Sequence, residues 1–437
     1  MTGEWQPMTL RAANVNLIDC DHRTPPAAED GYPYVAIPQM RGGRIEFGDA
    51  RRISREHYLE WTRKAKPSAN DVILSRRCNP GETAVVPPGA EFALGQNLVL
   101  LRADGTKVYP PFLRWLVRGP DWWEQVGKFI NAGAVFDSLK CSEVPNFELR
   151  IPPVPEQRAI AHILGTLDDK IELNRRTNES LEAMARALFK SWFVDFDPVR
   201  AKVKRRDTGL PKALADLFPS RLVDSDLGEI PEGWEVGGLL DHARLMSGGT
   251  PRTDEPDYWG GSIQWASAGD VSQSPGTFLS WTQRTITERG LNESATQLIP
   301  AFCSVVVARG ATTGRMVIFG AEMAMNQTCY ALASTTATPF ALYCRLRVEI
   351  DSLVHAAHGS VFDTITTSTF ASSRIVLPPQ QLLTAFEERA ASLFLRALES
   401  TRETRALGAL RDALLPKLIS GELRLSKTEG LLERVTT

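Results

Sequence analysis

The chain has 437 residues, of which 43% are hydrophobic and 23% charged, and its formal net charge is −2. This composition is typical of a globular protein of two to four domains, and any nucleic acid must be bound by local basic patches because the overall charge is not basic. No apolar run reaches membrane-spanning length, the first residues do not resemble a signal peptide, and the six cysteines form no CxxC pair. We therefore expect a cytoplasmic protein in a reducing compartment that does not engage a membrane.

Residues 1–152 predict a domain of mixed strands and helices. Short runs rich in β-branched and aliphatic residues, separated by turns with Gly and Pro, indicate strands. A later stretch that begins with Pro predicts a helix. The predicted strands are residues 34–37, 71–74 and 98–101, and the predicted helix is residues 111–116.

Basic and amide side chains in this domain point to nucleic-acid binding. Residues 41–66 are rich in Arg and Lys, and a pair of arginines ends a predicted strand just before a turn. Arginine at loop tips suits phosphate contacts, and Arg with Asn or Gln suits the edges of bases. The alternative is that most of these are solvated surface charges. The candidate DNA-binding residues of this domain are Arg41, Arg44, Arg76, Arg77, Gln96 and Asn97.

Residues 153–194 predict one long helix. From Gln157 to Phe193 the chain has no Pro, and good helix formers make up most of it. Apolar residues recur in heptads, and two asparagines interrupt them at the centre, as in a coiled-coil seam with a polar break. The seam positions are Ile160, Leu164, Leu167, Ile171, Asn174, Asn178, Leu181, Ala185, Leu188 and Trp192.

Residues 195–232 are interpreted as a connector with a basic run and one short helix at 212–217. Residues 233–378 then repeat the first domain. Pro378-Pro379 matches Pro152-Pro153 at an offset of 226, and further upstream, at an offset of 233, Arg309 matches Arg76 and Gly314 matches Gly81. A two-copy repeat of this length indicates duplication and a pseudo-symmetric molecule.

The second domain offers DNA-binding candidates at matching places. Arg76 and Arg309 could equally form structural salt bridges inside their domains. Predicted strands lie at 304–307 and 316–319, and a helix is predicted at 339–346. The candidate DNA-binding residues of this domain are Arg309, Thr312, Thr313, Arg315, Asn326 and Gln327.

Residues 379–420 predict the second long helix, and residues 421–437 a loose tail. Antiparallel pairing with the first helix would set Asn174 opposite Thr404 and Asn178 opposite Ser400. Arg411 is out of character in a seam, and we expect its charge to reach water. Two unrelated amphipathic helices are the alternative. The seam positions are Phe386, Ala390, Leu393, Ala397, Ser400, Thr404, Leu407, Arg411, Leu414 and Leu418.

Nothing in the sequence supports catalysis. An amino-methyltransferase that uses S-adenosylmethionine would need an Asn- or Asp-Pro-Pro-aromatic motif, and a phosphate-binding loop would need G-x-x-x-x-G-K-[ST]; neither occurs. His355 and His358 have a spacing of three, but no second ligand pair accompanies them. We interpret them as surface or pocket-lining residues, and we expect neither a catalytic nor a metal site.

Several segments resemble the specificity subunits of type I restriction–modification systems, over nearly the whole chain. The matching segments are Ile151-Pro-Pro-Val-Pro-Glu-Gln-Arg158, Leu167-Asp-Asp-Lys-Ile171, Ser191-Trp-Phe-Val-Asp-Phe196 and Leu414-Leu-Pro-Lys-Leu-Ile-Ser-Gly-Glu-Leu423. The resemblance implies an α+β fold with two repeated mixed α/β target-recognition domains. They are separated by two long helices that form an antiparallel coiled coil, with pseudo-two-fold symmetry.

The resemblance also implies function and partners. Each recognition domain would read one half of a split, asymmetric target in double-stranded DNA, and the helices would set the spacing. The chain would bind no cofactor, whereas two modification subunits would bring S-adenosylmethionine and the restriction subunits, which are translocases, would bring ATP and Mg. A structural adaptor that does not touch DNA and an enzyme with an unrecognised site are the alternatives. Because only four residues precede Trp5, the first strand of the first domain is expected to be incomplete.

Overall fold

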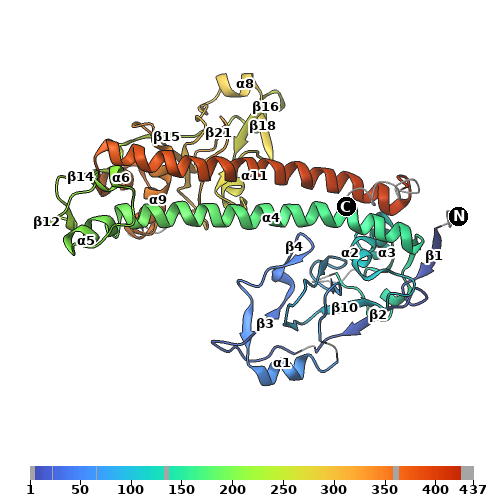
Figure 1. Cartoon of the computed structure of the whole chain (residues 1–437). Coiled ribbons are helices and arrows are strands. Elements are labelled where there is room, and N and C mark those ends of the chain that lie inside the picture. The colour runs from blue at the N-terminus through green and yellow to red at the C-terminus, as the bar shows by residue number, and fades with distance from the viewer. Residues whose placement is uncertain (1–4, 22, 65, 132–136, 358–363, 425–437) are drawn as a thin grey trace. The chain divides into compact units, whose positions relative to one another are not determined.

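The computed structural model describes residues 5–21, 23–64, 66–131, 137–357 and 364–424 (Figure 1). The chain divides into two compact units, one of residues 1–170 with 407–437 and the other of residues 171–406. The two longest helices are α4, Val154–Phe193, and α11, Gln380–Ser420. Each of them contributes one end to each unit, so unit 1 is built from two separate stretches of sequence and unit 2 from one.

Unit 1 contains a four-stranded sheet of order β2-β10-β7-β8 and a three-stranded sheet of order β6-β3-β9. Two pairs, β1-β11 and β4-β5, complete it. Its strands are β1 Gln6–Thr9, β2 Val15–Asp19, β3 Tyr32–Val35, β4 Met40–Arg41, β5 Arg44–Ile45, β6 Arg51–Ile53, β7 Val72–Ser75, β8 Thr83–Val85, β9 Ala93–Leu94, β10 Leu98–Ala103 and β11 Glu148–Ile151. Its shorter helices are α1 Arg55–Trp61, α2 Pro110–Leu116 and α3 Pro120–Phe129, with 3-10 turns at Ile37–Gln39 and Val144–Asn146.

Unit 2 contains a five-stranded sheet of order β15-β22-β19-β20-β17, a three-stranded sheet of order β18-β16-β21 and the pair β14-β23. Its strands are β14 Glu235–Gly238, β15 Ala243–Ser247, β16 Trp259–Ala266, β17 Phe278–Leu279, β18 Arg284–Ile286, β19 Ser304–Val307, β20 Met316–Phe319, β21 Ala324–Met325, β22 Cys329–Ser334 and β23 Arg374–Leu377. Its helices are α7 Ala268–Gln273, α8 Glu288–Asn292, α9 Pro339–Ala357 and α10 Thr367–Ser372, with 3-10 turns at Leu239–Asp241 and Pro256–Tyr258.

The two units share one strand order. The order β2-β10-β7-β8 in unit 1 corresponds to β15-β22-β19-β20 in unit 2, and β6-β3-β9 corresponds to β18-β16-β21. The predicted duplication is therefore present in the topology. The expectation of an incomplete first strand is wrong, because β1 has four residues and pairs antiparallel with β11 as β14 pairs with β23.

The connector is more structured than the sequence predicts. It holds two helices, α5 Asp197–Val203 and α6 Lys212–Ala215, and the hairpin of β12 Leu222–Ser225 with β13 Gly228–Pro231. Val199 is fully buried in the same apolar cluster as Phe196 and Phe218. Pro198 favours the start of α5 because its fixed φ suits the first turn of a helix. Because the residues that follow are basic, the sequence alone does not indicate that this segment is anchored in the core by Val199.

The long helices pack on the core of each unit. In unit 1, Ile160 and Leu164 of α4 and Leu418 of α11 join the cluster that holds Trp115 and Trp122. In unit 2, Phe189, Trp192 and Phe193 of α4 meet Phe386 of α11 edge to face. Every predicted seam position on both helices is buried or half-buried.

The polar break pairs differently from the prediction. In unit 2, Asn174 Nδ2 donates to Glu403 Oε2 at 2.8 Å, and Asn178 Nδ2 donates to Thr401 Oγ1 at 3.1 Å. The order of these partners shows that the helices are antiparallel. Ser400 Oγ donates to the backbone oxygen of Asn174, not to Asn178, at 3.4 Å. The seam is thus offset from the predicted pairing, and Thr404 Oγ1 has no hydrogen-bond partner among the described residues.

The expectation for Arg411 is also wrong. Its side chain is only 18% exposed, and its Nη1 lies 2.7 Å from Oδ1 of Asp168 on α4 in unit 1. Asp168 is itself buried. The guanidinium therefore does not extend freely into water but lies between two carboxylates, the buried Asp168 and the exposed Asp412, which is 2.7 Å from its Nη2.

Phe394 gives a direct test of how α11 is held in unit 2. Its ring is 1% exposed and stacks on Phe340 with ring centroids 4.9 Å apart. Removing a buried ring leaves a cavity, so Phe394→Ala should lower the free energy of unfolding by about 3–5 kcal/mol. The adjacent Leu395 is 42% exposed, and Leu395→Ala should change it by less than about 0.5 kcal/mol. Urea denaturation followed by tryptophan fluorescence measures both, and equal midpoints for the two variants would contradict this packing.

Candidate nucleic-acid interface

In unit 1 two turns that are distant in sequence meet at one end of the four-stranded sheet. The first joins β7 to β8, and the second joins β9 to β10. The backbone N–H of Arg76 donates to the backbone oxygen of Asn97 at 2.9 Å. Asn97 has a φ of 66°, which Asn adopts more readily than most residues. The structure thus brings four predicted residues together, namely Arg76, Arg77, Gln96 and Asn97.

Unit 2 repeats this arrangement. The backbone N–H of Ala308 donates to the backbone oxygen of Thr328 at 2.8 Å, which joins the β19–β20 turn to the β21–β22 turn. All six residues predicted for this domain lie in these two turns. They are Arg309, Thr312, Thr313 and Arg315 in the first turn and Asn326 and Gln327 in the second.

The hydrogen bonds correct the register of the repeat by one residue. Gly81 N–H donates to the backbone oxygen of Ser75 at 3.0 Å, and Gly314 N–H donates to that of Val307 at 2.9 Å. Ser75 therefore corresponds to Val307, at an offset of 232, whereas the glycines differ by 233. Five residues separate the first pair and six the second. The predicted match of Arg76 with Arg309 is wrong, because the arginine that corresponds to Arg309 is Arg77.

The arginine that corresponds to Arg309 is also the one that faces solvent. Successive residues of an extended chain point to opposite sides, and here Arg77 is exposed while Arg76 is half-buried. Burial raises the pKa of Cys20 to about 11, and the charge of Arg76 opposes that rise. Arg76 therefore faces the domain interior. Its Nε is buried and has no hydrogen-bond partner among the described residues.

The guanidinium groups of Arg77 and Arg309 face solvent. Both side chains are exposed, and neither forms an ion pair within the described part of the chain. The structural salt bridge considered as an alternative for Arg309 is thus not formed among these residues. Each arginine instead uses only its backbone, Arg77 in a bridge to Ser138 and Arg309 in a bridge to Thr364.

Several polar side chains of unit 2 stabilise the turns themselves. Thr313 Oγ1 donates to the backbone oxygen of Gly310 at 2.7 Å, and Asn326 Oδ1 accepts from Thr328 Oγ1 at 2.7 Å. Arg315 and Gln327 are exposed. Their donors therefore face solvent at the same end of the sheet as Arg309.

Two further residues of this surface escaped the sequence analysis. Thr250 Oγ1 donates to Gln327 Oε1, and Ser272 Oγ donates to Thr312 Oγ1 at 2.7 Å. A Cβ at Gly248 would lie 2.3 Å from the backbone oxygen of Asn326, so only glycine allows this approach. In the sequence, the Gly248-Gly249 pair before Thr250 is the feature that could have indicated this close approach.

Arg41 and Arg44 do not join the other candidates of unit 1. They flank the tight turn of the β4–β5 hairpin, which lies beside α4 in Figure 1. Arg41 is exposed and pairs with Glu46 at 2.9 Å. Arg44 Nη2 donates to the backbone oxygen of Asp168 at 2.6 Å. This arginine therefore holds the hairpin against the helix.

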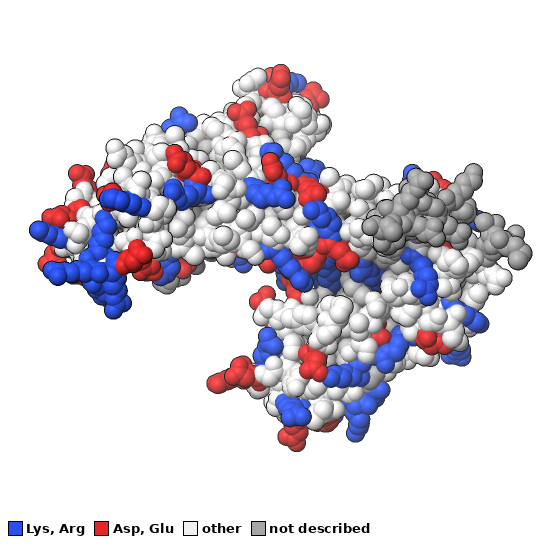
Figure 2. Space-filling view, in the orientation of Figure 1, with Lys and Arg blue, Asp and Glu red and all other residues white. Residues whose placement is uncertain are grey.

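The connector carries another basic surface, visible over α5 in Figure 2. Lys202 Nζ donates to the backbone oxygen of Phe218 at 2.6 Å, and Arg200 Nε donates to that of Asp195 at 2.9 Å. These two side chains thus bond to backbone atoms elsewhere in the connector and stabilise its fold. The exposed remainder of the run is Lys204, Arg205 and Arg206.

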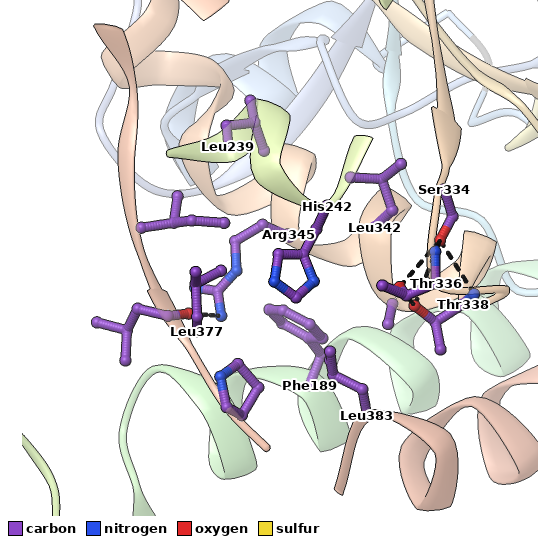
Figure 3. Close-up of a pocket in the computed structure, with 14 residues that line it drawn as sticks. Phe189, Leu239, His242, Ser334, Thr336, Thr338, Leu342, Arg345, Leu377 and Leu383 are labelled. Carbon is purple, nitrogen blue, oxygen red and sulfur yellow. Dashed lines mark hydrogen bonds between the residues drawn. The ribbon is translucent and has the colours of Figure 1, made fainter. Parts of the chain in front are cut away.

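A pocket in unit 2 offers little room for a cofactor (Figure 3). Its cavity of about 40 Å³ suffices for two or three waters. Arg345 projects into it and donates to the backbone oxygen of Val376 at 3.2 Å, and burial lowers the pKa of this arginine to about 10. On the other side the hydroxyls of Ser334, Thr336 and Thr338 bond one another.

The described residues contain no group of three or more His, Cys, Asp or Glu side chains placed to hold a metal ion. The side chains of His355 and His358 lie outside the described residues. The repeated segments at 133–138 and 359–364 and the tail after residue 424 lie wholly or largely outside them as well. None of the helices in the described ranges is long and apolar enough to cross a membrane.

Comparison with known proteins agrees with this arrangement. Residues 22–183 and 231–382 match the type I restriction modification DNA specificity domain. The chain is 26% identical over 377 residues to the type I restriction enzyme HindI specificity subunit of Haemophilus influenzae, covering 76% of this chain and 81% of that protein. It is 27% identical over 418 residues to the MjaIX specificity subunit of Methanocaldococcus jannaschii, covering 90% of each.

A solved structure shares the fold. The S subunit of a type I restriction–modification system from M. genitalium superposes with a TM-score of 0.56 at 16% identity, covering 95% of this chain and 96% of that one. At this identity the likeness concerns the fold alone. The duplicated sheets and the long helices are therefore an architecture that a distant sequence also adopts.

The β7–β8 turn can be probed through its own cysteine. Cys78 is exposed, whereas Cys20, Cys303, Cys329 and Cys344 are buried and Cys141 is half-buried. Burial raises the pKa of Cys329 to about 12, which suppresses its reactive thiolate. The folded chain should therefore be alkylated by iodoacetamide first at Cys78, and peptide mass spectrometry measures the order. Denaturation should make all six react alike, and early modification of Cys329 in the folded chain would contradict this burial.

Proposed function

This chain belongs to the family of type I restriction–modification DNA specificity domains, and we propose that each of its two copies reads one half of a bipartite, asymmetric DNA target. The chain is the specificity subunit and is itself non-catalytic. One observation carries the proposal. Each unit presents an exposed arginine, Arg77 or Arg309, in a turn that is hydrogen-bonded to a second turn bearing an exposed Gln96 or Gln327.

The chemistry of these side chains suits base reading. A guanidinium group can donate two hydrogen bonds to O6 and N7 of guanine, and a glutamine amide can pair with N6 and N7 of adenine. We assign this role to Arg77, Gln96, Arg309, Arg315 and Gln327. Thr312 and Arg41 are exposed and suit phosphate contacts. Arg76, Asn97, Thr313 and Asn326 support these turns through internal contacts, whereas Arg44 holds the β4–β5 hairpin against α4.

The recognition domains extend over residues 1–152 and 233–378, and the helices at 153–194 and 379–420 act as the spacer. Residues 195–232 form the connector and 421–437 the tail. Both sheet systems fall inside these domain limits. Each helix also packs into the core of its own recognition domain, which favours a spacer that moves with the domains it joins.

The partners follow from membership in a type I system. We assign double-stranded DNA, two modification subunits that bind S-adenosylmethionine, and restriction subunits that use ATP and Mg. The long helices retain exposed apolar side chains at Leu173, Met184, Leu395 and Leu410, which suit protein contacts. We place the complex in the cytoplasm with the DNA that it reads. No observation favours an adaptor without DNA affinity.

Substituting the matched arginines should affect one half-site each. In the reconstituted complex, Arg77→Ala should relax discrimination in one half of the target and Arg309→Ala in the other, each at a cost of about 1–3 kcal/mol. Binding to targets with single base changes in either half measures this. Arg396→Ala, on the exposed face of α11, is the control and should leave both halves unchanged. Equal losses in both halves for one variant would contradict the assignment of one domain to each half-site.

The spacer role predicts a dependence on helix length. One heptad inserted into both helices, after Lys170 and after Ala406 where the units divide, adds about 10 Å. That length equals about 3 base pairs at 3.4 Å each. The best target should have a longer spacer but bind more weakly, because DNA turns about 100° over that length.

The bases read in each half should stay the same in the lengthened protein. A heptad inserted into only one helix serves as the control and should destabilise the fold by misaligning the polar layer. Binding to a series of targets with graded spacers measures the optimum. An unchanged optimum at unchanged affinity would mean that the helices do not set the spacing.

A further inference from the structure

The three-stranded sheets of the two units carry an arginine at the same position. In unit 1, Arg51 of β6 lies opposite Tyr34 of β3. In unit 2, Arg284 of β18 lies opposite Trp265 of β16. On its other side each aromatic residue pairs with the strand that precedes the glutamine-bearing turn, which is β9 or β21. Arg51 and Arg284 therefore correspond to each other by strand register.

The aromatic residue beside each arginine is bonded toward the glutamine-bearing turn. In unit 1, the backbone N–H of Gln96 donates to the Tyr34 hydroxyl at 3.2 Å. In unit 2, Trp265 Nε1 donates to the backbone oxygen of Gly249 at 3.0 Å, and the N–H of Gly249 donates to the last residue of β21 at 2.9 Å. Both arginines thus lie next to the surface that we assign to base reading.

The two arginines are exposed. Within the described ranges neither Arg51 nor Arg284 forms an ion pair. In unit 2, Asp270 accepts from the backbone N–H of Gln283, which precedes Arg284, and its other oxygen accepts from Ser267 at the start of α7. This acid is therefore used by the fold, and the arginine beside it keeps a charged face toward solvent.

The two copies hold this arginine by different contacts. Arg51 Nη1 donates to the backbone oxygen of Pro25 at 3.1 Å. The guanidinium of Arg284 instead lies over the ring of Trp259, with its Cζ 3.4 Å from the ring centroid, and 5.7 Å from that of Trp265. The local support has changed between the copies, whereas the cation has not. A role in local packing alone therefore does not explain why both copies have arginine here.

The next residue of the strand differs between the copies. Arg52 follows Arg51, whereas Thr285 follows Arg284. Neighbouring residues of a strand point to opposite faces, so Arg52 points away from the face that carries Tyr34. A general requirement for positive charge on this strand would not distinguish the two faces. Only the arginine on the aromatic face is common to both copies.

The position of these arginines suits the backbone of a duplex better than its bases. The orders β6-β3-β9 and β18-β16-β21 place each arginine two strand spacings, about 10 Å, from the strand that leads into the glutamine-bearing turn. The major groove is about 12 Å wide, and the phosphates form its rims. A guanidinium group suits a phosphate because its planar fork donates two parallel hydrogen bonds and stays charged.

We propose that Arg51 and Arg284 each bind one backbone phosphate at the rim of the groove, one in each half of the DNA target. This inference rests on the proposed function and adds contacts that orient each recognition domain without carrying sequence information. Arg51 acts in the half that Arg77 reads, and Arg284 in the half that Arg309 reads, because each pair belongs to one unit.

Salt dependence of DNA binding tests the proposal in the complete complex. Each phosphate contact contributes about 0.9 to the slope of the logarithm of affinity against the logarithm of salt concentration. Arg51→Gln and Arg284→Gln should each make the slope shallower by about that amount, and the double variant by about twice as much. Discrimination between correct and altered targets should stay the same in all three variants.

The chain offers a matched control in each unit. Arg52→Gln removes the same charge from the adjacent position of β6, on the opposite face of the strand. Arg289→Gln serves unit 2, because Arg289 is exposed and pairs with Glu293 at 3.0 Å. Both controls should keep the original slope. Arg51→Lys and Arg284→Lys retain the charge and should retain most of the slope as well.

A scan with neutral phosphates locates the two contacts. Duplexes that carry one methylphosphonate at successive positions should reveal one position in each half-site that weakens the original complex. Methylphosphonate at the position in the half read by Arg77 should not weaken Arg51→Gln further. The position in the other half should behave in this way with Arg284→Gln.

Other outcomes would overturn the proposal. Slopes for Arg51→Gln and Arg284→Gln equal to those of the controls would do so, and an earlier melting transition of Arg284→Gln at the original slope would show that this arginine only packs on Trp259. Relaxed discrimination would identify a base contact. Weaker assembly with the modification subunits at an unchanged slope would identify a protein carboxylate as the ligand. If the complex containing the unaltered chain shows no preference for any target, the proposed function itself fails.

Discussion

The structure depends on the antiparallel pairing of α4 and α11, because each helix supplies part of the core of both units. Ile160 and Leu164 belong to the core of unit 1, while Trp192 and Phe193 on the same helix belong to that of unit 2. Neither recognition domain can bury its apolar surface without them. The polar layer of Asn174, Glu403 and Ser400 then selects one alignment of the helices from several that heptads allow.

Much of the fold could be predicted from periodicity and repetition. The heptads located both helices because apolar spacing reports directly on the buried face, and the offset of 226 revealed the duplication. One-residue differences could not be predicted. The β19–β20 turn is longer than its counterpart by one residue, and that shift decides whether Arg76 or Arg77 corresponds to Arg309. A sequence alignment gives the spacing between residues, but the direction in which a side chain points depends on the hydrogen-bond register of its strand.

The buried charges were missed for a related reason. A single Asp168 after a seam leucine looks like a surface residue, and only the folded chain places Arg114 and Arg411 around it. Duplication gave two copies of one scaffold, and their interiors then diverged. One copy holds the helices with an ionic cluster and the other with stacked aromatic rings. The scaffold tolerates both because the long helices supply the surrounding apolar contacts.

The central claim is that this chain selects the DNA sequence at which its complex acts. The most direct measurement is a genome-wide map of methylated bases in cells that carry the modification subunits with and without this chain. The account predicts methylation at one bipartite sequence, with two different half-sites a fixed distance apart, and its disappearance when the chain is removed. A methylation pattern that does not depend on the chain, or one confined to a single uninterrupted sequence, would contradict it.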